Sequence, residues 1–100
     1  MSPNARILVV DDKQSFRFMI RGYLDDAGYQ TECAASGVEA LVLLEQGHFD
    51  LVLSDMAMPE MDGMTLLRQV RSSHPLLPFV LVTAHGSIDS AVAAIKGGGR

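Results

Sequence analysis

Oxygen-bearing side chains follow directly after three apolar runs of this 100-residue chain. The runs cover residues 7–10, 51–54 and 79–82, and the residues that follow them are Asp11 with Asp12, then Asp55, then Thr83. If the runs are neighbouring strands of a parallel sheet, their carboxyl ends share the edge where such sheets build their sites. We therefore expect the three carboxylates to lie close together.

Carboxylates packed this closely favour a divalent cation between them. They raise one another's pKa values and destabilise the fold unless a cation or a proton compensates their charge. Magnesium takes six oxygen ligands at about 2.0–2.1 Å, and one or two carboxylates usually hold it together with water and a phosphate. Asp11, Asp12 and Asp55 meet that demand, so the sequence predicts a magnesium site.

The same residues could accept a phosphoryl group. A metal ion can neutralise the charge that spreads over the phosphoryl oxygens while a carboxylate attacks in line. Asp55 is the best candidate for the nucleophile because it stands alone at the end of the middle run. Thr83 would place a hydroxyl at the next strand end, where it can donate a hydrogen bond to a bound phosphoryl oxygen. A nucleophile at Asp55 with a hydroxyl donor at Thr83 therefore predicts a phosphorylation-dependent switch.

Strand and helix patterns alternate along the chain. Continuous apolar runs at 7–10, 51–54 and 79–82 are typical of strands that are buried on both faces, and the more polar stretch 29–34 predicts a strand at the edge of the sheet. Alternation of this kind predicts an α/β fold in which a doubly wound parallel sheet has helices on both faces and the first strand at its centre.

Helical spacing and end signals predict the helices between those strands. The first is predicted from five apolar residues at helical spacing, with Gly28 placed where a left-handed cap would follow it: Phe16, Met19, Ile20, Tyr23 and Leu24. A capping box of Ser36 and Glu39 begins the second, which runs to about residue 46. The third is built on Leu66, Leu67 and Val70 and stops before Pro75. Ser87 is expected to cap a fourth, which glycines 97–99 end.

Composition limits the class of protein. The length and the 48% hydrophobic content suit one globular domain over residues 1–100, with a glycine-rich end at 97–100. A net charge of −4 with scattered basic residues argues against direct nucleic-acid binding. Cys33 is the sole cysteine, and no segment approaches a signal peptide or a membrane span. We therefore expect a cytoplasmic protein that does not bind membranes.

The motifs resemble those of a known family, the receiver domains of two-component response regulators. The resemblance rests on the acidic pair after ILVV, on LVLSDMAMPEMDG, and on LPFVLVTAHGSIDSAVAAIKGG. It runs from about residue 6 to residue 98 and is strongest to receivers of the nitrogen-regulator and dicarboxylate-regulator type. It implies a flavodoxin-like fold with strand order 2-1-3-4 and a phosphoacceptor signalling domain rather than an enzyme.

The resemblance also implies a role for each site residue. Asp55 would be the phosphoacceptor, and Asp12, Asp55 and the backbone carbonyl of Ala57 would bind magnesium directly, with Asp11 acting largely through water. Thr83 would be the switch hydroxyl. The implied partners are a sensor histidine kinase and a downstream output domain or protein. The residues that could tune the site are Lys13, Ala84 and His85, of which Lys13 could equally be a solvated charge and His85 an exposed loop residue.

The sequence departs from the family after the predicted fourth helix. The family's fifth strand, its lysine that pairs with the phosphoryl group, and its fifth helix are missing, so the receiver domain is expected to be C-terminally truncated. Without that lysine the phosphorylated state should be less stabilised. The strand at 79–82 should then present an apolar edge, and such edges template pairing with another chain. The sequence therefore predicts a homodimer through this strand.

Two other functions remain open at this point. The first is a receiver-like interaction domain, or a fragment, that keeps the acidic residues but no longer switches. The second is a phosphatase with an aspartyl nucleophile. Such hydrolases usually place a second acid two residues after the nucleophile, and in this chain that position is Ala57. This makes the phosphatase the weakest of the three hypotheses.

Overall fold

The computed structural model of the protein describes residues 4–82. Several predictions concern residues outside this part: the switch hydroxyl of Thr83, the tuning residues Ala84 and His85, the helix capped by Ser87, the glycine-rich end, and the missing fifth strand and helix.

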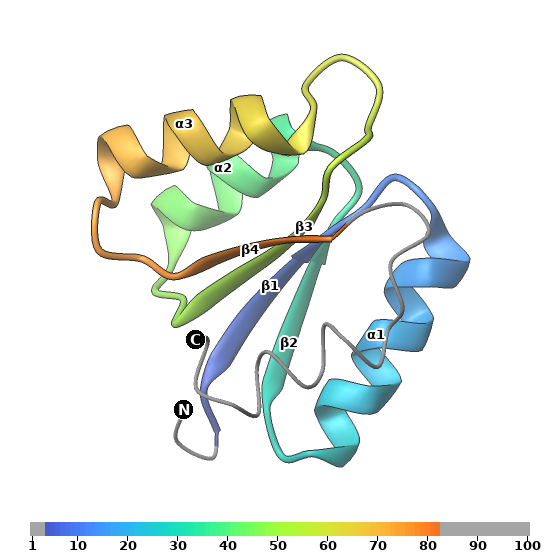
Figure 1. Cartoon of the computed structure of the whole chain (residues 1–100). Helices are drawn as coiled ribbons and strands as arrows, with labels where there is room; N and C mark the ends of the chain where they lie inside the picture. Colours follow the sequence, from blue (N-terminus) through green and yellow to red (C-terminus); the bar gives the residue numbers. More distant parts are fainter. Residues whose placement is uncertain (1–3, 83–100) are drawn as a thin grey trace.

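Four parallel strands and three helices alternate along the described residues (Figure 1). In chain order they are β1 (Arg6–Val10), α1 (Gln14–Asp26), β2 (Gln30–Ala34), α2 (Gly37–Gln46), β3 (Leu51–Asp55), α3 (Gly63–Ser73) and β4 (Phe79–Val82). The strand order is β2-β1-β3-β4, and every neighbouring pair is parallel. The predicted α/β fold and strand order are therefore confirmed.

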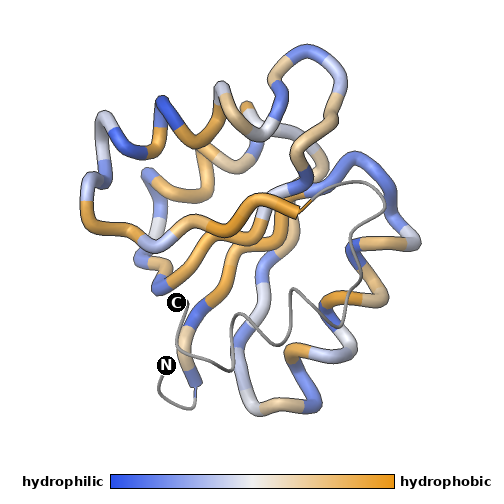
Figure 2. Tube along the Cα trace, viewed as in Figure 1, coloured by the Kyte–Doolittle hydropathy of each residue, from blue (hydrophilic) through white to orange (hydrophobic). Residues whose placement is uncertain are grey.

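The sheet has a hydrophobic core on each face. Side chains alternate between faces along a strand, so Ile7 and Val9 of β1 pack on the side of α1, where Ile20 and Leu24 cover them. Leu8 and Val10 point the other way and join the buried residues of α2 and α3: Ala40, Leu44, Leu66 and Val70. Figure 2 shows β1, β3 and β4 as the most hydrophobic part of the trace, whereas β2 is more polar. Helices on both faces confirm the doubly wound arrangement.

Helix α1 buries only some of the apolar residues that recur at helical spacing. Ile20 and Leu24 are buried and Phe16 packs against the same cluster, but Met19 is 47% exposed and Tyr23 is 48% exposed. Phe16, Ile20 and Leu24 are four residues apart and form a narrow stripe, whereas Met19 and Tyr23 form a second stripe about 100° away around the helix. Only the first stripe packs against the core of the sheet.

Local signals set the ends of the helices. Gly28 follows α1 with φ of 96°, which is the left-handed conformation expected after a helix. The Ser36 side chain accepts a hydrogen bond from the backbone N–H of Glu39 at 3.1 Å and so caps α2 as predicted. Asp62 caps α3 in the same way, accepting from the N–H of Thr65 at 2.8 Å. This second cap was not predicted from the sequence.

Strand β4 lies at one edge of the sheet formed by residues 4–82. Its first three residues are half-buried and Val82 is buried. The strand therefore occupies the expected position in the sheet, and the homodimer through its edge stays a prediction.

Arg6 links the beginning of β1 to the segment before β3. Its backbone N–H donates to Asp50 Oδ2 at 2.7 Å, and one guanidinium nitrogen donates to the carbonyl of His48 at 3.1 Å. The guanidinium also lies over the Phe49 ring, 4.6 Å from its centre, and pairs with Glu32 of β2. These contacts tie the beginning of β1 to the segment before β3 and to the middle of β2.

This arrangement gives stability a dependence on pH. The backbone N–H of Arg6, helped by His48, lowers the pKa of Asp50. An acid whose pKa is lower in the folded state stabilises the fold above its unfolded pKa, and that contribution is lost as the pH falls through the folded value. We therefore expect Asp50→Asn to be less stable than the parent at about pH 7, with a gap that closes below about pH 4.

Urea unfolding followed by circular dichroism at several pH values measures this gap. The same substitution at the exposed Asp26 of α1 controls for the change in net charge. A gap of constant size from neutral to acid pH would contradict the assignment to Asp50.

Candidate functional site

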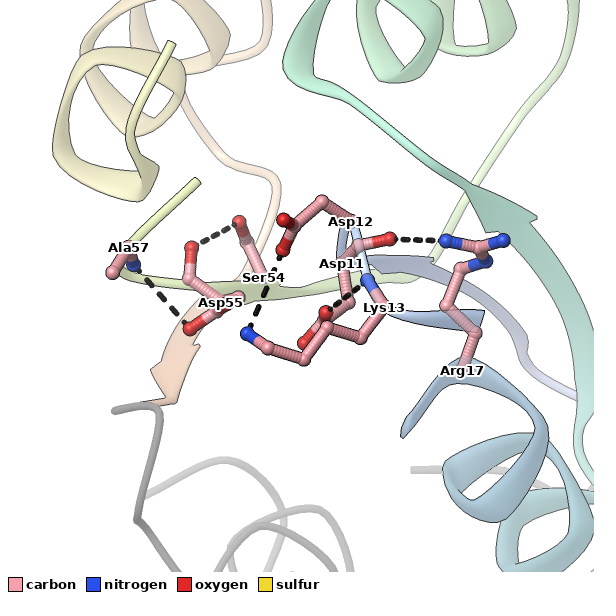
Figure 3. Close-up of polar contacts among 7 residues, drawn as sticks. All are labelled: Asp11, Asp12, Lys13, Arg17, Ser54, Asp55 and Ala57. Atoms are coloured by element: carbon pink, nitrogen blue, oxygen red, sulfur yellow. Dashed lines mark hydrogen bonds and ion pairs between the residues drawn. The ribbon is translucent and has the colours of Figure 1, made fainter. Parts of the chain in front are cut away.

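Asp11, Asp12 and Asp55 come together at the carboxyl ends of β1 and β3 (Figure 3). The two strands pair up to Val10 and Ser54, and the residue that follows each of these in the chain is an aspartate, Asp11 or Asp55. One carboxylate oxygen from each of the three residues lies within 4.8 Å of the other two. This acidic triad confirms that the three carboxylates converge, as the spacing predicted.

Asp55 is the most enclosed member of the acidic triad. It is the last residue of β3 and is only 3% exposed. Its Oδ1 accepts a hydrogen bond of 3.3 Å from the backbone N–H of Ala57, while Oδ2 is buried without a partner in the described structure. Buried polar atoms without a partner are rare, and each requires an explanation. An ionised oxygen in this position is expected to bind a ligand.

Asp11 is equally buried, at 3% exposure, and its carboxylate is held by the chain that follows it. Oδ1 accepts a hydrogen bond of 2.8 Å from the backbone N–H of Lys13. Burial raises the pKa of Asp11, the nearby charges of Asp55 and Asp12 raise it further, and the hydrogen bond from Lys13 opposes them. The ionised form of Asp11 is therefore costly in the fold unless a cation lies nearby.

Two basic side chains lie next to the acidic triad but contact different groups. Lys13 Nζ is 3.8 Å from Oδ1 of Asp12, the exposed member of the triad. Arg17 donates from its guanidinium to the backbone carbonyl of Asp11 at 2.6 Å. Arg17 thus fixes the turn between β1 and α1 by binding the main chain, whereas Lys13 reaches a carboxylate (Figure 3).

The loop after Asp55 is tied to β4 and α3 by main-chain contacts. The N–H of Met56 donates to the carbonyl of Val82 at 2.9 Å, and the N–H of Gly63 donates to the carbonyl of Met56 at 2.9 Å. A side chain at Gly63 would collide with the carbonyl oxygen of Asp55 and would lie 2.6 Å from Leu81 Cδ2. Close packing of α3 against the end of β3 therefore holds Asp55 in place.

The methionines around this loop have divided roles. Met58 and Met61 pack against the core cluster of α2 and α3, as expected for core filling, and Met61 lies against Gly37 at the start of α2. Met56 and Met64 are exposed. Half of this group therefore anchors the loop that contains Ala57.

Some determinants of the site are visible only in the structure. The close approach at Gly63, the N–H of Ala57 on Asp55 and the contact of Arg17 with a carbonyl all depend on the main-chain path. The one available signal was the D-G-x-T segment from Asp62 to Thr65, in which a capping residue stands immediately before Gly63.

The residues present fit a hard divalent cation. Every side-chain ligand of the triad is a carboxylate oxygen, and the described residues hold the three ligand atoms close together with one buried oxygen free. Oxygen-only ligand sets suit magnesium, calcium and manganese rather than softer metals. The acidic triad is therefore able to bind a metal ion.

Comparison with known proteins identifies the family. The family model of the response regulator receiver domain matches residues 7–100. The chain belongs to this family, whose members are regulatory phosphoacceptor domains of two-component signalling rather than conventional enzymes.

Relatives of known identity agree with this assignment. The chain is 40% identical over 92 residues to the DNA-binding transcriptional regulator NtrC of Escherichia coli, covering 92% of this chain and 20% of NtrC. It is 36% identical to the chemotaxis protein CheY4 of Vibrio cholerae, with a TM-score of 0.77 over 94% of this chain and 80% of that chain. The chain thus spans about a fifth of the length of the curated relatives it matches.

A third relative was solved with a metal ion. The response regulator TrrA of Thermotoga maritima, in complex with Mg²⁺-BeF, is 32% identical, with a TM-score of 0.78 over 91% of this chain and 79% of that chain. The acidic pocket of Asp11, Asp12 and Asp55 is typical of the phosphoacceptor site of receiver domains, which bind magnesium.

Within residues 4–82, none of the helices combines the length and apolar composition that crossing a bilayer requires.

Proposed function

We propose that this chain is a phosphoacceptor domain of a two-component phosphorelay, in which a sensor histidine kinase transfers a phosphoryl group to Asp55. The observation that supports this most directly is the buried Oδ2 of Asp55, which has no hydrogen-bond partner among residues 4–82 and belongs to a carboxylate that lies close to those of Asp11 and Asp12. A nucleophile needs a lone pair that is free and held in place. Phosphorylation then shifts the population of conformations and so alters the binding of an output domain or protein.

The residues around Asp55 have separate tasks in this transfer. The N–H of Ala57 holds Oδ1 and leaves Oδ2 free to attack phosphorus. The new bond joins Oδ2 to phosphorus, the bond between phosphorus and the histidine nitrogen of the donor breaks, and that nitrogen keeps the electron pair. When bound, magnesium supplies positive charge to the phosphoryl oxygens, and Asp11, Asp12, Asp55 and the Ala57 carbonyl would hold it. Thr83 is proposed as the switch hydroxyl.

We further propose that the output of the complete protein is control of transcription. The support is the similarity to NtrC, which is a DNA-binding transcriptional regulator, and to the regulatory protein AtoC of Escherichia coli. We expect residues 1–100 to make no direct contact with DNA, because the net charge is −4 and the basic residues are scattered.

Chemical phosphorylation tests the role of Asp55. Incubation with Mg²⁺ and acetyl phosphate should give a single adduct by intact mass that is stable in acid and labile in base. Asp55→Asn should abolish the adduct, because a neutral amide does not attack phosphorus as a carboxylate does. Asp26→Asn, the same change on the exposed surface of α1, should leave it unchanged.

The two alternative functions predict different outcomes. A phosphatase would release inorganic phosphate steadily with little adduct at any time. An interaction domain that no longer switches would give no adduct although the fold is intact. An adduct that persists in Asp55→Asn would overturn the assignment of the phosphoacceptor.

A further inference from the structure

Lys13 lies at the boundary between the acidic triad and helix α1. It is the residue before Gln14, with φ of −99° and ψ of 117°, and its side chain makes no capping hydrogen bond with the helix. The extended backbone directs the Lys13 N–H toward Asp11 Oδ1, at 2.8 Å. Figure 3 shows the Lys13 side chain folded back toward the acidic triad, with its ammonium next to Asp12.

This position distinguishes Lys13 from the other basic residues of the described part. In residues 4–82 the ion pairs are Arg6 with Glu32, Lys13 with Asp12, Arg21 with Asp25 and His48 with Asp50. Lys13 is thus the one cation there that pairs with a carboxylate of the acidic triad. Its charge also acts on Asp11, where it opposes the effect of burial.

We propose that Lys13 is an internal counter-cation that occupies the acidic triad when no metal is bound and competes with the divalent cation for the same carboxylates. This inference rests on the proposed function only in taking the triad as the metal site. The Lys13 side chain is more than half exposed, so its ammonium can leave the triad without a rearrangement of the core.

Competition follows from charge and geometry. A divalent ion held by Asp12 would lie close to the ammonium, which is 3.8 Å from Asp12 Oδ1, and two cations at such a distance repel each other. Metal binding must therefore displace the ammonium or bear this repulsion. In the metal-free protein the same ammonium offsets part of the repulsion among the three carboxylates.

Removal of the Lys13 charge should strengthen Mg²⁺ binding but destabilise the metal-free protein. We expect Lys13→Gln to bind Mg²⁺ about three- to tenfold more tightly than the parent. With EDTA present, the same variant should melt about 2–4 °C lower because the acidic triad has lost its counter-charge. In saturating Mg²⁺ the difference in melting temperature should shrink or reverse. A merely structural role for Lys13 would shift both melting temperatures in the same direction.

Titration calorimetry with MgCl₂ and thermal melts with and without metal test the proposal. Lys13→Arg keeps the charge and should bind Mg²⁺ within about twofold of the parent. Arg21→Gln removes the same charge from the ion pair with Asp25 on α1 and should leave the affinity unchanged because salt screens distant charges.

The outcomes distinguish the metal site itself from the role of Lys13. A parent protein that binds no Mg²⁺ would overturn both the metal site and the competition. A parent that binds Mg²⁺ with the same affinity as Lys13→Gln would overturn the role of Lys13 and leave the metal site standing.

Discussion

Replacing Gly63 by alanine should cost about 2–3 kcal/mol of unfolding free energy, the upper part of the range for overpacked sites. The new methyl group would collide with the carbonyl oxygen of Asp55 and would lie 2.9 Å from the Cα of Met56. Both are main-chain atoms, so α3 must move away from β3. Because the displaced carbonyl belongs to Asp55, affinity for Mg²⁺ should also fall.

Urea unfolding measures the loss, and Gly22→Ala is the matched control. Gly22 lies inside α1 with nothing within 4 Å of an added methyl group. Alanine there should stabilise the protein by about 0.5–1 kcal/mol, since glycine is a poor helix former. If both variants shifted stability in the same direction, the close approach at Gly63 would not be the determinant that the structure indicates.

Asp11→Asn is expected to change stability in opposite directions with and without metal. The amide oxygen can still accept the hydrogen bond from the Lys13 N–H, so the turn keeps its main contact. Without metal, loss of one buried charge from the acidic triad should stabilise the fold by about 1 kcal/mol. A ligand at 100 times its dissociation constant stabilises a fold by about 2.7 kcal/mol. Tenfold weaker binding by the variant removes about 1.4 kcal/mol of that gain.

Thermal and urea unfolding in EDTA and in excess Mg²⁺ compare the two states. The parent should gain stability on adding Mg²⁺, and Asp11→Asn should gain clearly less. Asp26→Asn, on the exposed end of α1, should respond to Mg²⁺ as the parent does. An equal gain in Asp11→Asn and the parent would show that Asp11 contributes nothing to cation binding.

Much of the fold could be predicted because each element has a strong local signal. The continuous apolar strands, the cap at Ser36 and the glycine after α1 all form as expected. The convergence of Asp11 with Asp55 also follows from strand ends alone, since neighbouring parallel strands end at one edge. The exposure of Met19 on α1 could not be predicted, because the helical spacing of apolar residues does not reveal how much of a helix the sheet will cover.

The finer features of the site depend on the path of the main chain. Sequence spacing gives no measure of how closely Gly63 approaches Asp55, nor which oxygen of Asp55 the Ala57 N–H will hold. The predicted ligand from Ala57 is its carbonyl, and that contact stays a prediction. The position of the Lys13 ammonium likewise depends on the extended backbone before α1, which the amino-acid type alone does not determine.

The alternation of side chains along β1 and β3 has a consequence for how this protein tolerates change. The two buried clusters, one beneath α1 and one beneath α2 and α3, have no residue in common within the described part of the chain. Mutations in separate clusters share no side-chain contact there, so their effects on stability should combine nearly additively when the mutated residues are well separated. Natural variation or design could therefore rework the packing under one layer of helices while the opposite layer keeps its sequence.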